Sequence, residues 1–562
     1  MSENVLGMLP SQPEAPADRT CPTIAEFYAG KTVALTGGTG FLGQGVIEKL
    51  LRCCPEIKKI ILFIRHKRNV EPKDRLSSLV ELPAFDNLWQ LQPNFVEKLS
   101  FVSCDLEADD LGLSKEDRKT LQNEVNVFYH SAATLKFNEQ LRLSFEVNVQ
   151  CVRRLLKLCK GMHHLHAFVH VSTAYSHCNR YTIDEKVYDT SLDYHDLENS
   201  FRWMNDSMVE KITPDVLGNR PNTYTLTKAL AEDAVCRESG NLPICIVRPS
   251  MIIPAWQEPM PGWCTNLYGP TAFFVAYGKG VLRSVIADKK IVADLIPVDL
   301  VVNGVIAAAL KTAVDHKLGE RSGSIDSGKP ADAVFTEDEM DVSSDSDIEA
   351  MVSIKHLVPI YNLTTGCHNP LYISDLVTFG KKWYSTYPLD PLRMPSITVT
   401  CNKYLHNASI IMLQTIPAYI YDMVLAVCSK RRKMVKLNSK LNAGMSVMEY
   451  FFTNEWRWKQ DNTTKLQKSL TPKDQKNFNF DARCFSWSEQ IKHYVIGTRQ
   501  FLVKENMNEY PKARKAVDRL RMMARCVNIV AAIGIYGVLS TTGITKFLWR
   551  VLTFLFSVLG FV

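Results

Sequence analysis

The fold of this chain is decided by the stretch Val33-Ala34-Leu35-Thr36-Gly37-Gly38-Thr39-Gly40-Phe41-Leu42-Gly43. An apolar run leads into a glycine-rich loop, and the helix-like residues 44–53 follow it. Glycine lets backbone approach a pyrophosphate closely, and the N–H groups of a helix N-terminus stabilise its charge. The stretch therefore predicts a dinucleotide site made by Thr36, Gly37, Gly38, Thr39, Gly40, Phe41, Leu42 and Gly43, with a purely conformational glycine turn as the alternative.

The first half of the chain has the pattern of a parallel sheet covered by helices. From residue 31 to about residue 250, short apolar runs alternate with longer stretches of helical period, which is typical of βαβ units. We expect strands at 33–35, 59–64, 100–103, 126–130, 167–172 and 244–248. The predicted fold class is therefore α/β, with a doubly wound parallel sheet of the Rossmann type.

The chain has 562 residues, which is more than one hydrophobic core usually organises. We expect the dinucleotide-binding domain at 29–320 and a smaller, mainly helical domain at 353–510, in which residues 354–373 are strand-like and 410–441 and 446–458 are helical. The remaining predicted parts are a flexible tail at 1–28, a disordered acidic insertion at 321–352, and a basic collar with a membrane segment at 511–562.

The C-terminal segment differs in composition from the rest. Residues 526–545 and 547–562 are almost wholly apolar, and together they exceed the roughly 20 residues that a bilayer crossing needs. They predict a C-terminal membrane anchor with the catalytic part in the cytosol, at the endoplasmic reticulum or the peroxisome. A buried helical hairpin and an interfacial hairpin that does not cross are the alternatives. The collar before them, expected on the cytosolic side, is Lys512, Arg514, Lys515, Arg519, Arg521 and Arg525.

Charge and cysteine usage exclude several classes of protein. The net charge of +7 is mild for this length, so nucleic acid is not an expected partner. The 15 cysteines include no Cys-x-x-Cys pair, which argues against a zinc site and against a disulfide scaffold. A histidine cluster lacks the spacing of a metal site, so we expect no metal and a structural role for His163, His164, His166 and His170.

The end of the second predicted strand indicates which dinucleotide binds. An acid about 20 residues after the glycines holds the ribose 2′-hydroxyl of NAD. Here the position holds Arg65, followed by Lys67 and Arg68, with no carboxylate to compete with them. These residues predict NADPH, with Arg65 and Arg68 at the 2′-phosphate, while a solvated basic loop is the alternative.

Two further strand ends lie at the same predicted edge of the sheet, where ligands of open α/β folds bind. Asp105 and Leu106 follow the third strand, and Asp105 is a candidate acceptor for the adenine amino group. Ser131, Ala132 and Ala133 follow the fourth strand, and their small size would let the cofactor ribose lie on the backbone. Ordinary strand-end chemistry explains both sets equally well.

The candidate catalytic residues are Ser172 and Thr173 at the end of the fifth strand, Tyr224 and Lys228 on a helix, and Asn148. Tyr224 and Lys228 are four residues apart, so they project from one helix face. The lysine cation is expected to lower the phenol pKa, and Tyr224 then protonates a substrate oxygen as hydride reaches the carbonyl carbon. Thr173, with Ser172 as the alternative, would donate a hydrogen bond to that oxygen.

Residues 31–300 resemble the extended short-chain dehydrogenases, and among them the male-sterility, fatty acyl-CoA reductase branch. The resemblance continues beyond residue 350 and covers nearly the whole chain, except the N-terminal tail and the insertion near 325–350. The matching phrases are 33–43, His130-Ser131-Ala132-Ala133-Thr134, His170-Val171-Ser172-Thr173-Ala174-Tyr175, Tyr224 to Lys228, Ile246-Val247-Arg248-Pro249-Ser250, Ile416-Pro417-Ala418-Tyr419 with Asp422, and 478–487.

The resemblance implies reduction of a long-chain acyl-CoA to a primary alcohol, with two NADPH consumed and an aldehyde intermediate. It implies that Lys228 tunes Tyr224 and holds the nicotinamide ribose, with Asn148 in support. Long-chain acyl-CoA and membrane lipid are then the expected partners, and a homodimer is left open. Two rivals remain, a membrane-bound NAD(P)-dependent sterol or sugar-nucleotide dehydrogenase or isomerase, and a non-catalytic cofactor-binding scaffold.

Overall fold

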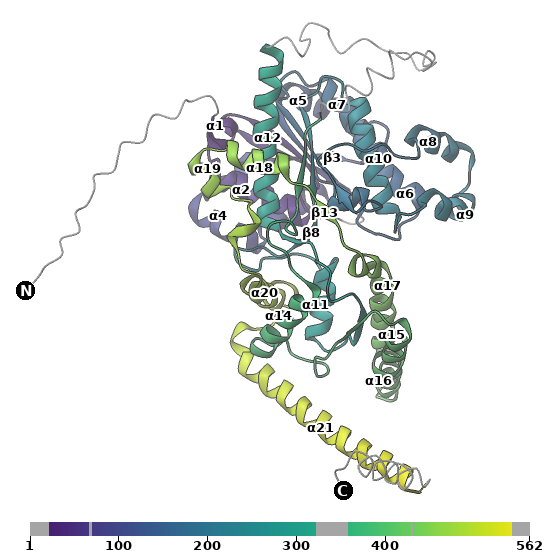
Figure 1. The fold of residues 1–562 in the computed structure, drawn as a ribbon. Coiled ribbons are helices and arrows are strands. Elements are labelled where there is room, and N and C mark those ends of the chain that lie inside the picture. Colours follow the sequence, from purple (N-terminus) through teal and green to yellow (C-terminus); the bar gives the residue numbers. More distant parts are fainter. Residues whose placement is uncertain (1–21, 67–69, 322–357, 429–430, 542–562) are drawn as a thin grey trace, which may run out of the picture. The chain divides into compact units, whose positions relative to one another are not determined.

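The computed structural model describes residues 22–66, 70–321, 358–428 and 431–541 (Figure 1). The chain forms two compact units, and neither is continuous in sequence. Unit 1 takes the described parts of Met1–Ser250, Val298–Thr364 and Trp458–Ala482. Unit 2 takes those of Met251–Pro297, Thr365–Arg457 and Arg483–Val562.

The predicted domains 29–320 and 353–510 were consecutive, whereas each compact unit contains segments from both ranges. Several predicted features lie outside the described residues. These are Lys67 and Arg68, the tail as far as residue 21, residues 322–352 of the insertion, and residues 542–562 of the membrane segment.

Unit 1 is built on a parallel sheet of seven strands in the order β11-β7-β5-β4-β1-β2-β3. Each neighbouring pair is parallel. The strands are β1 Thr32–Thr36, β2 Lys59–Arg65, β3 Leu99–Cys104, β4 Val125–His130, β5 Ala167–Val171, β7 Ile244–Pro249 and β11 Ile360–Leu363. The doubly wound α/β fold is confirmed, and the strand order reverses between β1 and β4, where such sheets bind ligands.

Helices cover both faces of the sheet. Ala34, Phe128 and Phe168 point into a core under α7 and α10, while Val33, Tyr129 and Val169, which alternate with them, are buried on the other face. That face is covered by α12, which contacts β5, β7 and α2. The helices are α1 Ile24–Tyr28, α2 Phe41–Cys53, α3 Pro72–Val80, α4 Asp86–Leu91, α5 Lys115–Glu124, α6 Leu141–Phe145, α7 Cys151–Lys160, α8 Tyr194–Trp203, α9 Asp206–Leu217, α10 Thr223–Glu238, α12 Val298–Arg321, α18 Asp461–Ser469 and α19 Pro472–Asn477.

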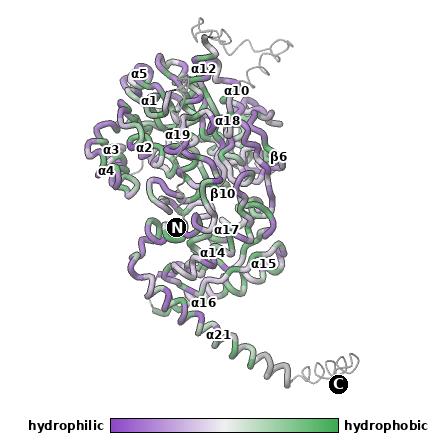
Figure 2. The backbone as a smooth tube through the Cα atoms, turned by 60° about the vertical axis from the view of Figure 1, so that its left-hand side comes forward, coloured by the Kyte–Doolittle hydropathy of each residue, from purple (hydrophilic) through white to green (hydrophobic). Residues whose placement is uncertain are grey.

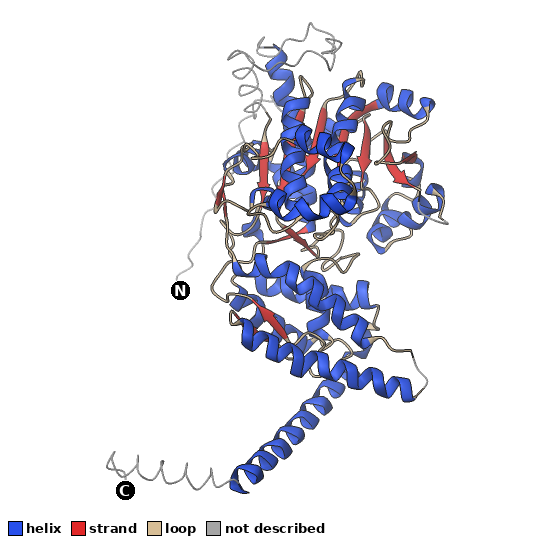
Figure 3. Cartoon of the chain, turned by 90° about the vertical axis from the view of Figure 1, so that its right-hand side faces the viewer, coloured by secondary structure: helices blue, strands red, loops and turns tan. Residues whose placement is uncertain are grey.

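Unit 2 is mainly helical (Figure 3). Its two small sheets pair β8 with β10 and β9 with β12. The strands are β8 Met251–Ile253, β9 Ser284–Ile286, β10 Leu295–Pro297 and β12 Thr398–Thr400. The helices are α11 Pro270–Gly278, α14 Ile373–Thr386, α15 Lys403–Ile410, the π-helical η5 Ile411–Thr415, α16 Ile416–Val427, α17 Met434–Thr453, α20 Trp487–Gly497 and α21 Tyr510–Thr541.

The predicted single helix over 410–441 is wrong, because α16 ends at Val427 and α17 begins at Met434. The reason is a tertiary cap. The carboxylate of Asp422 accepts hydrogen bonds from the backbone N–H groups of Lys433, Met434 and Val435, at 3.0, 3.0 and 2.9 Å. These bonds satisfy N–H groups at the start of α17 and favour a new helix there. The predicted helix 446–458 is the second half of α17 and ends at Thr453.

Candidate active site

The glycine loop joins β1 to α2 at the point where the strand order reverses. Gly37 has a φ of +75°, which side chains rarely tolerate, and a Cβ there would lie 2.9 Å from the backbone N of Ala132. A Cβ on Gly43 would lie 2.3 Å from the carbonyl oxygen of Gly37. Both neighbours are backbone atoms that cannot move aside. The loop, α2 and the end of β4 therefore approach one another as closely as glycine alone permits.

Thr36 ties the end of β4 to this loop. Its hydroxyl oxygen accepts hydrogen bonds from the N–H groups of Ser131 and Ala132, at 3.2 and 3.3 Å. It also lies 2.8 Å from Nδ1 of His130, and burial lowers the pKa of His130 to about 3. The imidazole is therefore neutral, and its tautomer decides which of the two atoms donates this hydrogen bond. The structure thus brings Thr36, the glycines and the half-buried residues 131–133 together.

A second arginine, which the sequence did not reveal, lies beside the loop. Arg75 of α3 donates hydrogen bonds to the hydroxyl of Thr39 at 3.0 Å and to the carbonyl oxygen of Arg65 at 2.6 Å. Burial and then the nearby Arg65 charge lower the pKa of Arg75. Its only sequence signal is a cation in the helix after the basic turn. Arg75 therefore adds a positive charge beside the glycine loop.

The prediction that no carboxylate competes for Arg65 is wrong. The Arg65 guanidinium forms an ion pair with Glu107 at 3.2 Å. The physical reason is the sheet register, which pairs Arg65 with Cys104 and so brings the residues after β3 beside the end of β2. Both partners are exposed, which makes this pair weak and replaceable by another anion.

Asp105 and Leu106 occupy the turn that follows β3. The exposed carboxylate of Asp105 accepts a hydrogen bond from the N–H of Glu107 at 3.1 Å. Leu106 is half-buried and packs against the core under α7 and α10. Asp105 therefore has a turn-forming role and Leu106 a packing role, and their cofactor roles stay predictions.

Tyr224 and Lys228 lie on α10, and both are buried at the end of β5. The phenol of Tyr224 is hydrogen-bonded to the side chain of Thr173. The ammonium of Lys228 donates to the carbonyl oxygen of Val171 at 2.9 Å. Asn222 caps the N-terminus of this helix, because its side chain accepts from the N–H of Thr225 at 2.9 Å. The structure therefore gathers the phenol, the ammonium and the threonine hydroxyl where β5 ends.

The pKa of Tyr224 is shifted in the direction opposite to the one expected from the sequence. Burial raises the pKa of Tyr224 to about 12, and the hydrogen bond to Thr173 offsets only part of that rise. Burial lowers the pKa of Lys228 to about 8, while the charge of Glu232 raises it. The expected lowering of the phenol pKa by Lys228 is absent from this arrangement, because burial dominates and the ammonium is bonded to Val171. Tyr224 is therefore protonated at neutral pH.

The side chains of Asn148 and Ser172 form hydrogen bonds with groups other than the Tyr224 phenol. The amide of Asn148 donates to the hydroxyl of Thr227 and accepts from the N–H of Thr134, both at 3.0 Å. It therefore links α10 to the segment after β4. The hydroxyl of Ser172 donates to Glu232. Between the two candidates at the strand end, Thr173 is the one bonded to the phenol.

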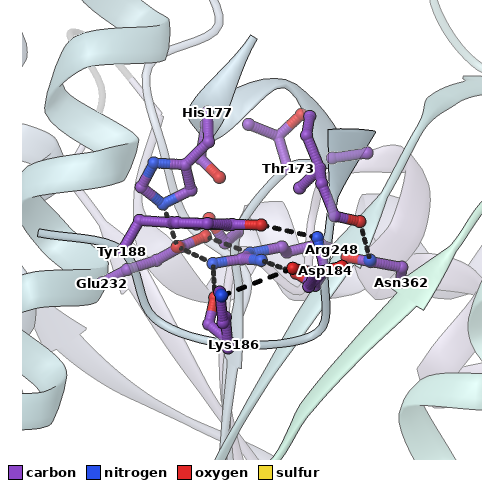
Figure 4. A network of polar contacts seen from close by, with 12 residues as sticks. Thr173, His177, Asp184, Lys186, Tyr188, Glu232, Arg248 and Asn362 are labelled. Atoms are coloured by element: carbon purple, nitrogen blue, oxygen red, sulfur yellow. Dashed lines mark hydrogen bonds and ion pairs between the residues drawn. The ribbon is translucent and has the colours of Figure 1, made fainter. Parts of the chain in front are cut away.

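A buried ion-pair network that the sequence did not predict is centred on Glu232 (Figure 4). Glu232 lies one helical turn beyond Lys228 on α10. Glu232 accepts from Nε and Nη2 of Arg248 at 3.0 and 2.6 Å, and lies 3.0 Å from His177. The side chains of Glu232 and Arg248 are 0% exposed. Burial would raise the pKa of Glu232, but Arg248 and then His177 hold it well below its ordinary value. Two features of the sequence could have indicated this network: Glu232 follows Lys228 by four residues, and Arg248 lies inside an apolar strand.

The histidine cluster forms no metal centre among the residues that the structure describes, where no three metal-binding side chains gather. His170 is buried in β5 beside His130, with ring centroids 5.3 Å apart. Burial holds its pKa well below the ordinary value.

Comparison with known proteins places the chain. Two family models, both described as male sterility protein, match residues 35–305 and 413–505. Fatty acyl-CoA reductase 1 of Xenopus laevis is 38% identical over 517 residues, covering 92% of this chain and 93% of that protein. The human protein of the same name is 36% identical over 515 residues, covering 92% and 93%. Fatty acyl-CoA reductase 2 of Mus musculus is 37% identical over 503 residues, covering 89% and 90%.

Solved structures agree on the fold. The reductase domain of a nonribosomal peptide synthetase from Mycobacterium tuberculosis aligns with a TM-score of 0.51 at 15% identity, covering 86% of this chain and 95% of that chain. The terminal R domain of the myxalamid pathway aligns with a TM-score of 0.50 at 17% identity, covering 84% and 92%. With the extensive identity to the curated relatives, these findings show that the chain belongs to the fatty acyl-CoA reductase family.

Proposed function

We propose that this chain reduces long-chain fatty acyl-CoA to a primary alcohol and free CoA, using two NADPH through an aldehyde intermediate. The observation that carries the proposal is the buried cluster of Thr173, Tyr224 and Lys228 at the end of β5. Its groups are those needed to protonate and stabilise an oxygen next to a carbon that receives hydride. The names of the relatives support acyl-CoA as the substrate.

The residues around the glycine loop fit a phosphorylated dinucleotide. The space beside Gly37 and Gly43 admits no Cβ, which suits close backbone contact with a pyrophosphate. Arg65 and Arg75 supply positive charge for a 2′-phosphate, and Arg65 would exchange the exposed Glu107 for it. NADPH bound there would supply one hydride for each reduction, with the spent NADP+ exchanged for a second NADPH between them. The other predicted contacts, Asp105, Leu106 and residues 131–133, belong to the same proposal.

In the first reduction, Tyr224 acts as the acid. Its raised pKa keeps the phenol protonated, so that it gives its proton to the thioester oxygen while the carbonyl carbon gains hydride. Thr173 donates a hydrogen bond to the same oxygen. The product is a hemithioacetal. Its hydroxyl proton then returns to the Tyr224 phenolate as the C–S bond breaks, which releases CoA thiolate and leaves an aldehyde.

In the second reduction, Tyr224 protonates the aldehyde oxygen as the carbon gains a second hydride, and solvent restores the phenol proton. In this proposal the Lys228 ammonium, which is charged below its pKa of about 8, turns from the Val171 carbonyl oxygen to the phenolate once that charge forms, and stabilises it between these steps. Asn148 holds α10 against the segment after β4 and so positions Tyr224.

The test is Tyr224→Phe in the full chain, with Tyr181→Phe, an exposed phenol of the same unit, as the matched control. NADPH oxidation with a panel of acyl-CoAs of differing length is followed together with the lipid product. We expect the first variant to lose oxidation while it still binds NADPH, and the control to form alcohol at the normal rate. Turnover by Tyr224→Phe would refute the acid role, and an aldehyde end product would limit the reaction to one reduction.

Cofactor choice has its own test. Arg65→Asp is expected to lower kcat/KM for NADPH roughly tenfold or more, since charged hydrogen bonds contribute about 1.5–3 kcal/mol, and to leave NADH less affected. Lys73→Asp, at an exposed position of α3, is the control. An unchanged preference for NADPH in Arg65→Asp would contradict the assignment.

We further propose that residues 511–562 anchor the protein to the endoplasmic reticulum or the peroxisome, with both units in the cytosol. The support is the collar on the described helix α21 and the lipid-soluble nature of the substrate and product. Extraction of the full chain from membranes with alkaline carbonate tests the anchor, and release into the soluble fraction would contradict it. Protease protection in isolated organelles distinguishes the two compartments.

A further inference from the structure

The segment Lys403–Val427 forms one helix in unit 2, made by α15, η5 and α16. Unlike a surface helix of a water-soluble protein, it has a mainly polar buried side and an apolar exposed side. Its buried stripe is polar at His406, Gln414 and Asp422, and apolar at Ala418. Each polar member is satisfied inside unit 2. His406 lies 2.9 Å from the Ser284 hydroxyl, Gln414 donates to Asn438 at 2.7 Å, and Asp422 caps α17. The side of the helix that packs on the protein is therefore the polar one.

The outer side of the same helix is apolar. Large hydrophobic side chains are exposed along its whole length. They are Tyr404, Leu405, Ile411, Met412, Leu413, Ile416, Tyr419, Ile420, Tyr421, Met423, Val424 and Val427. Figure 2 colours the backbone of α15 and α16 by hydropathy. A soluble protein rarely leaves so continuous an apolar surface in water, and such a surface marks a contact with a partner or a membrane.

Length and burial indicate how this helix meets its partner. The helix has 25 residues, and its most apolar 18 have a mean hydropathy of 1.6, with only 17% of them buried, so it is not a core helix. At about 1.5 Å per residue it is long enough to cross a bilayer. However, its polar stripe is bonded to β9 and α17 from His406 to Asp422. One side therefore remains against protein along the helix, which favours a face-on contact over a crossing.

The charges around the helix favour lipid over a second copy of the chain. From residue 403 to residue 440 the sequence has seven Lys and Arg and one acid, the buried Asp422. Lys403 is paired with Glu449 of α17 at 3.1 Å. The stretch 431–440 has cations and no acid of its own, so two copies meeting through this face would bring like charges together there. Anionic headgroups provide the missing negative charge, and tyrosines suit the boundary between headgroup and acyl chain. The exposed cations of the described chain here are Lys403, Arg431, Arg432, Lys433, Lys436 and Lys440.

We propose that the helix Lys403–Val427 is a second membrane contact of this protein, distinct from the C-terminal segment. Its outer face lies in the plane of an anionic lipid surface with the apolar side chains among the acyl chains. The basic residues 431–440 bind the headgroups. This contact holds unit 2 on the membrane by its side, whereas the C-terminal segment provides only a tether.

Photolabelling from within the lipid tests the contact in the full chain. The protein is placed on vesicles of phosphatidylcholine and phosphatidylserine whose acyl chains carry a diazirine, and peptides with lipid adducts are identified by mass spectrometry. We expect adducts within residues 404–427 as well as near the C-terminus. The exposed side chains Leu91 and Trp203 of unit 1 serve as internal controls and should remain unlabelled. This readout needs no turnover, so it is independent of the reductase proposal.

Substitutions in the helix test which of its residues contact lipid. In this proposal the C-terminal segment keeps every variant on the vesicles, so the adducts can be compared. Ile420→Glu with Met423→Glu changes only exposed positions and should reduce adducts on this helix severalfold, while Leu392→Glu, an exposed position elsewhere in unit 2, should not. Arg431→Glu with Arg432→Glu should reduce them by roughly fivefold per charge removed, and only when phosphatidylserine is present. Adducts confined to the C-terminus, or cross-links between copies at residues 404–427, would overturn the proposal.

Discussion

Replacing Glu232 by glutamine is expected to destabilise unit 1 and to change the protonation of Lys228. Glutamine has nearly the same shape, and it retains the capacity to bond Ser172 and His177. It removes the negative charge that faces Arg248, whose side chain is 0% exposed. The variant therefore leaves one buried cation without its anion.

The magnitude follows from the burial of the pair. Removing one partner of a buried, hydrogen-bonded ion pair costs about 3–5 kcal/mol, because the other charge keeps its desolvation penalty. Arg248 keeps two neutral acceptors, the carbonyl oxygens of Asp184 at 3.2 Å and Lys186 at 3.1 Å (Figure 4). Carbonyl dipoles compensate a guanidinium only in part, so we expect a loss in free energy of unfolding of about 3 kcal/mol or more.

The assay must follow unit 1 by itself, since a chain of two units need not unfold in one step. Hydrogen exchange of peptides from α10 and β7, measured along a urea series, gives the unfolding midpoint of the unit that contains Glu232. Glu238→Gln on the same helix is the control. Its carboxylate pairs with Arg153 but is 25% exposed, and Arg153 retains Glu198, so the expected loss is about 1 kcal/mol or less.

A double variant separates the charge effect from a packing effect. Glu232→Gln combined with Arg248→Met leaves no buried guanidinium without its carboxylate, so its loss of stability should be smaller than the sum of the two single losses. The reasoning is refuted if Glu232→Gln costs no more than Glu238→Gln, or if the two single losses simply add.

Two pH dependences follow from the pKa shifts. The pKa of Lys228 is lowered to about 8, chiefly by burial, so acyl-CoA-dependent NADPH oxidation should fall as pH rises through that value. Glu232→Gln removes a charge that raises this pKa and should move the fall to lower pH; an identical pH–rate profile would contradict the link. Burial lowers the pKa of His130 to about 3 and of His177 to about 4, below their ordinary value of 6.5. Folded unit 1 keeps both neutral, so its stability is full above pH 6.5 and falls by roughly 1.4 kcal/mol per pH unit for each histidine as pH drops toward about 4. Urea midpoints of unit 1 at a series of pH values measure this, and a flat dependence would be incompatible with it.

The sheet was predictable because its signals are local. Runs such as 59–64 and 244–248 are apolar on both faces, as strands of a covered parallel sheet must be, and the observed β2 and β7 extend each by one residue. The Tyr224–Lys228 spacing likewise needs only one helix. The prediction of one continuous helix over 410–441 was wrong because the cap from Asp422, which lies inside that range, is a tertiary interaction.

The residues that the sequence did not reveal all depend on how distant segments meet. Arg75 reaches Thr39 across 36 residues, and Glu107 reaches Arg65 across 42. Glu232 and Arg248 are closer in sequence, but neither shows its partner until α10 packs beside β5 and β7. Charged residues are ordinarily exposed, so the sequence predicts each of them at the surface without an ion-pair partner.

One face of α10 carries the proposed acid, the lysine beside it and the buried carboxylate of Glu232. Tyr224, Lys228 and Glu232 follow one another at intervals of four residues, so each lies about one turn beyond the last. Glu232 is bonded to Arg248, and its charge also raises the pKa of Lys228, which burial lowers. A neutral residue at position 232 is therefore expected to weaken the fold and to lower the pKa of Lys228 further. Because Ser172 also donates to Glu232, the same carboxylate fixes the strand end that carries Thr173 toward the phenol.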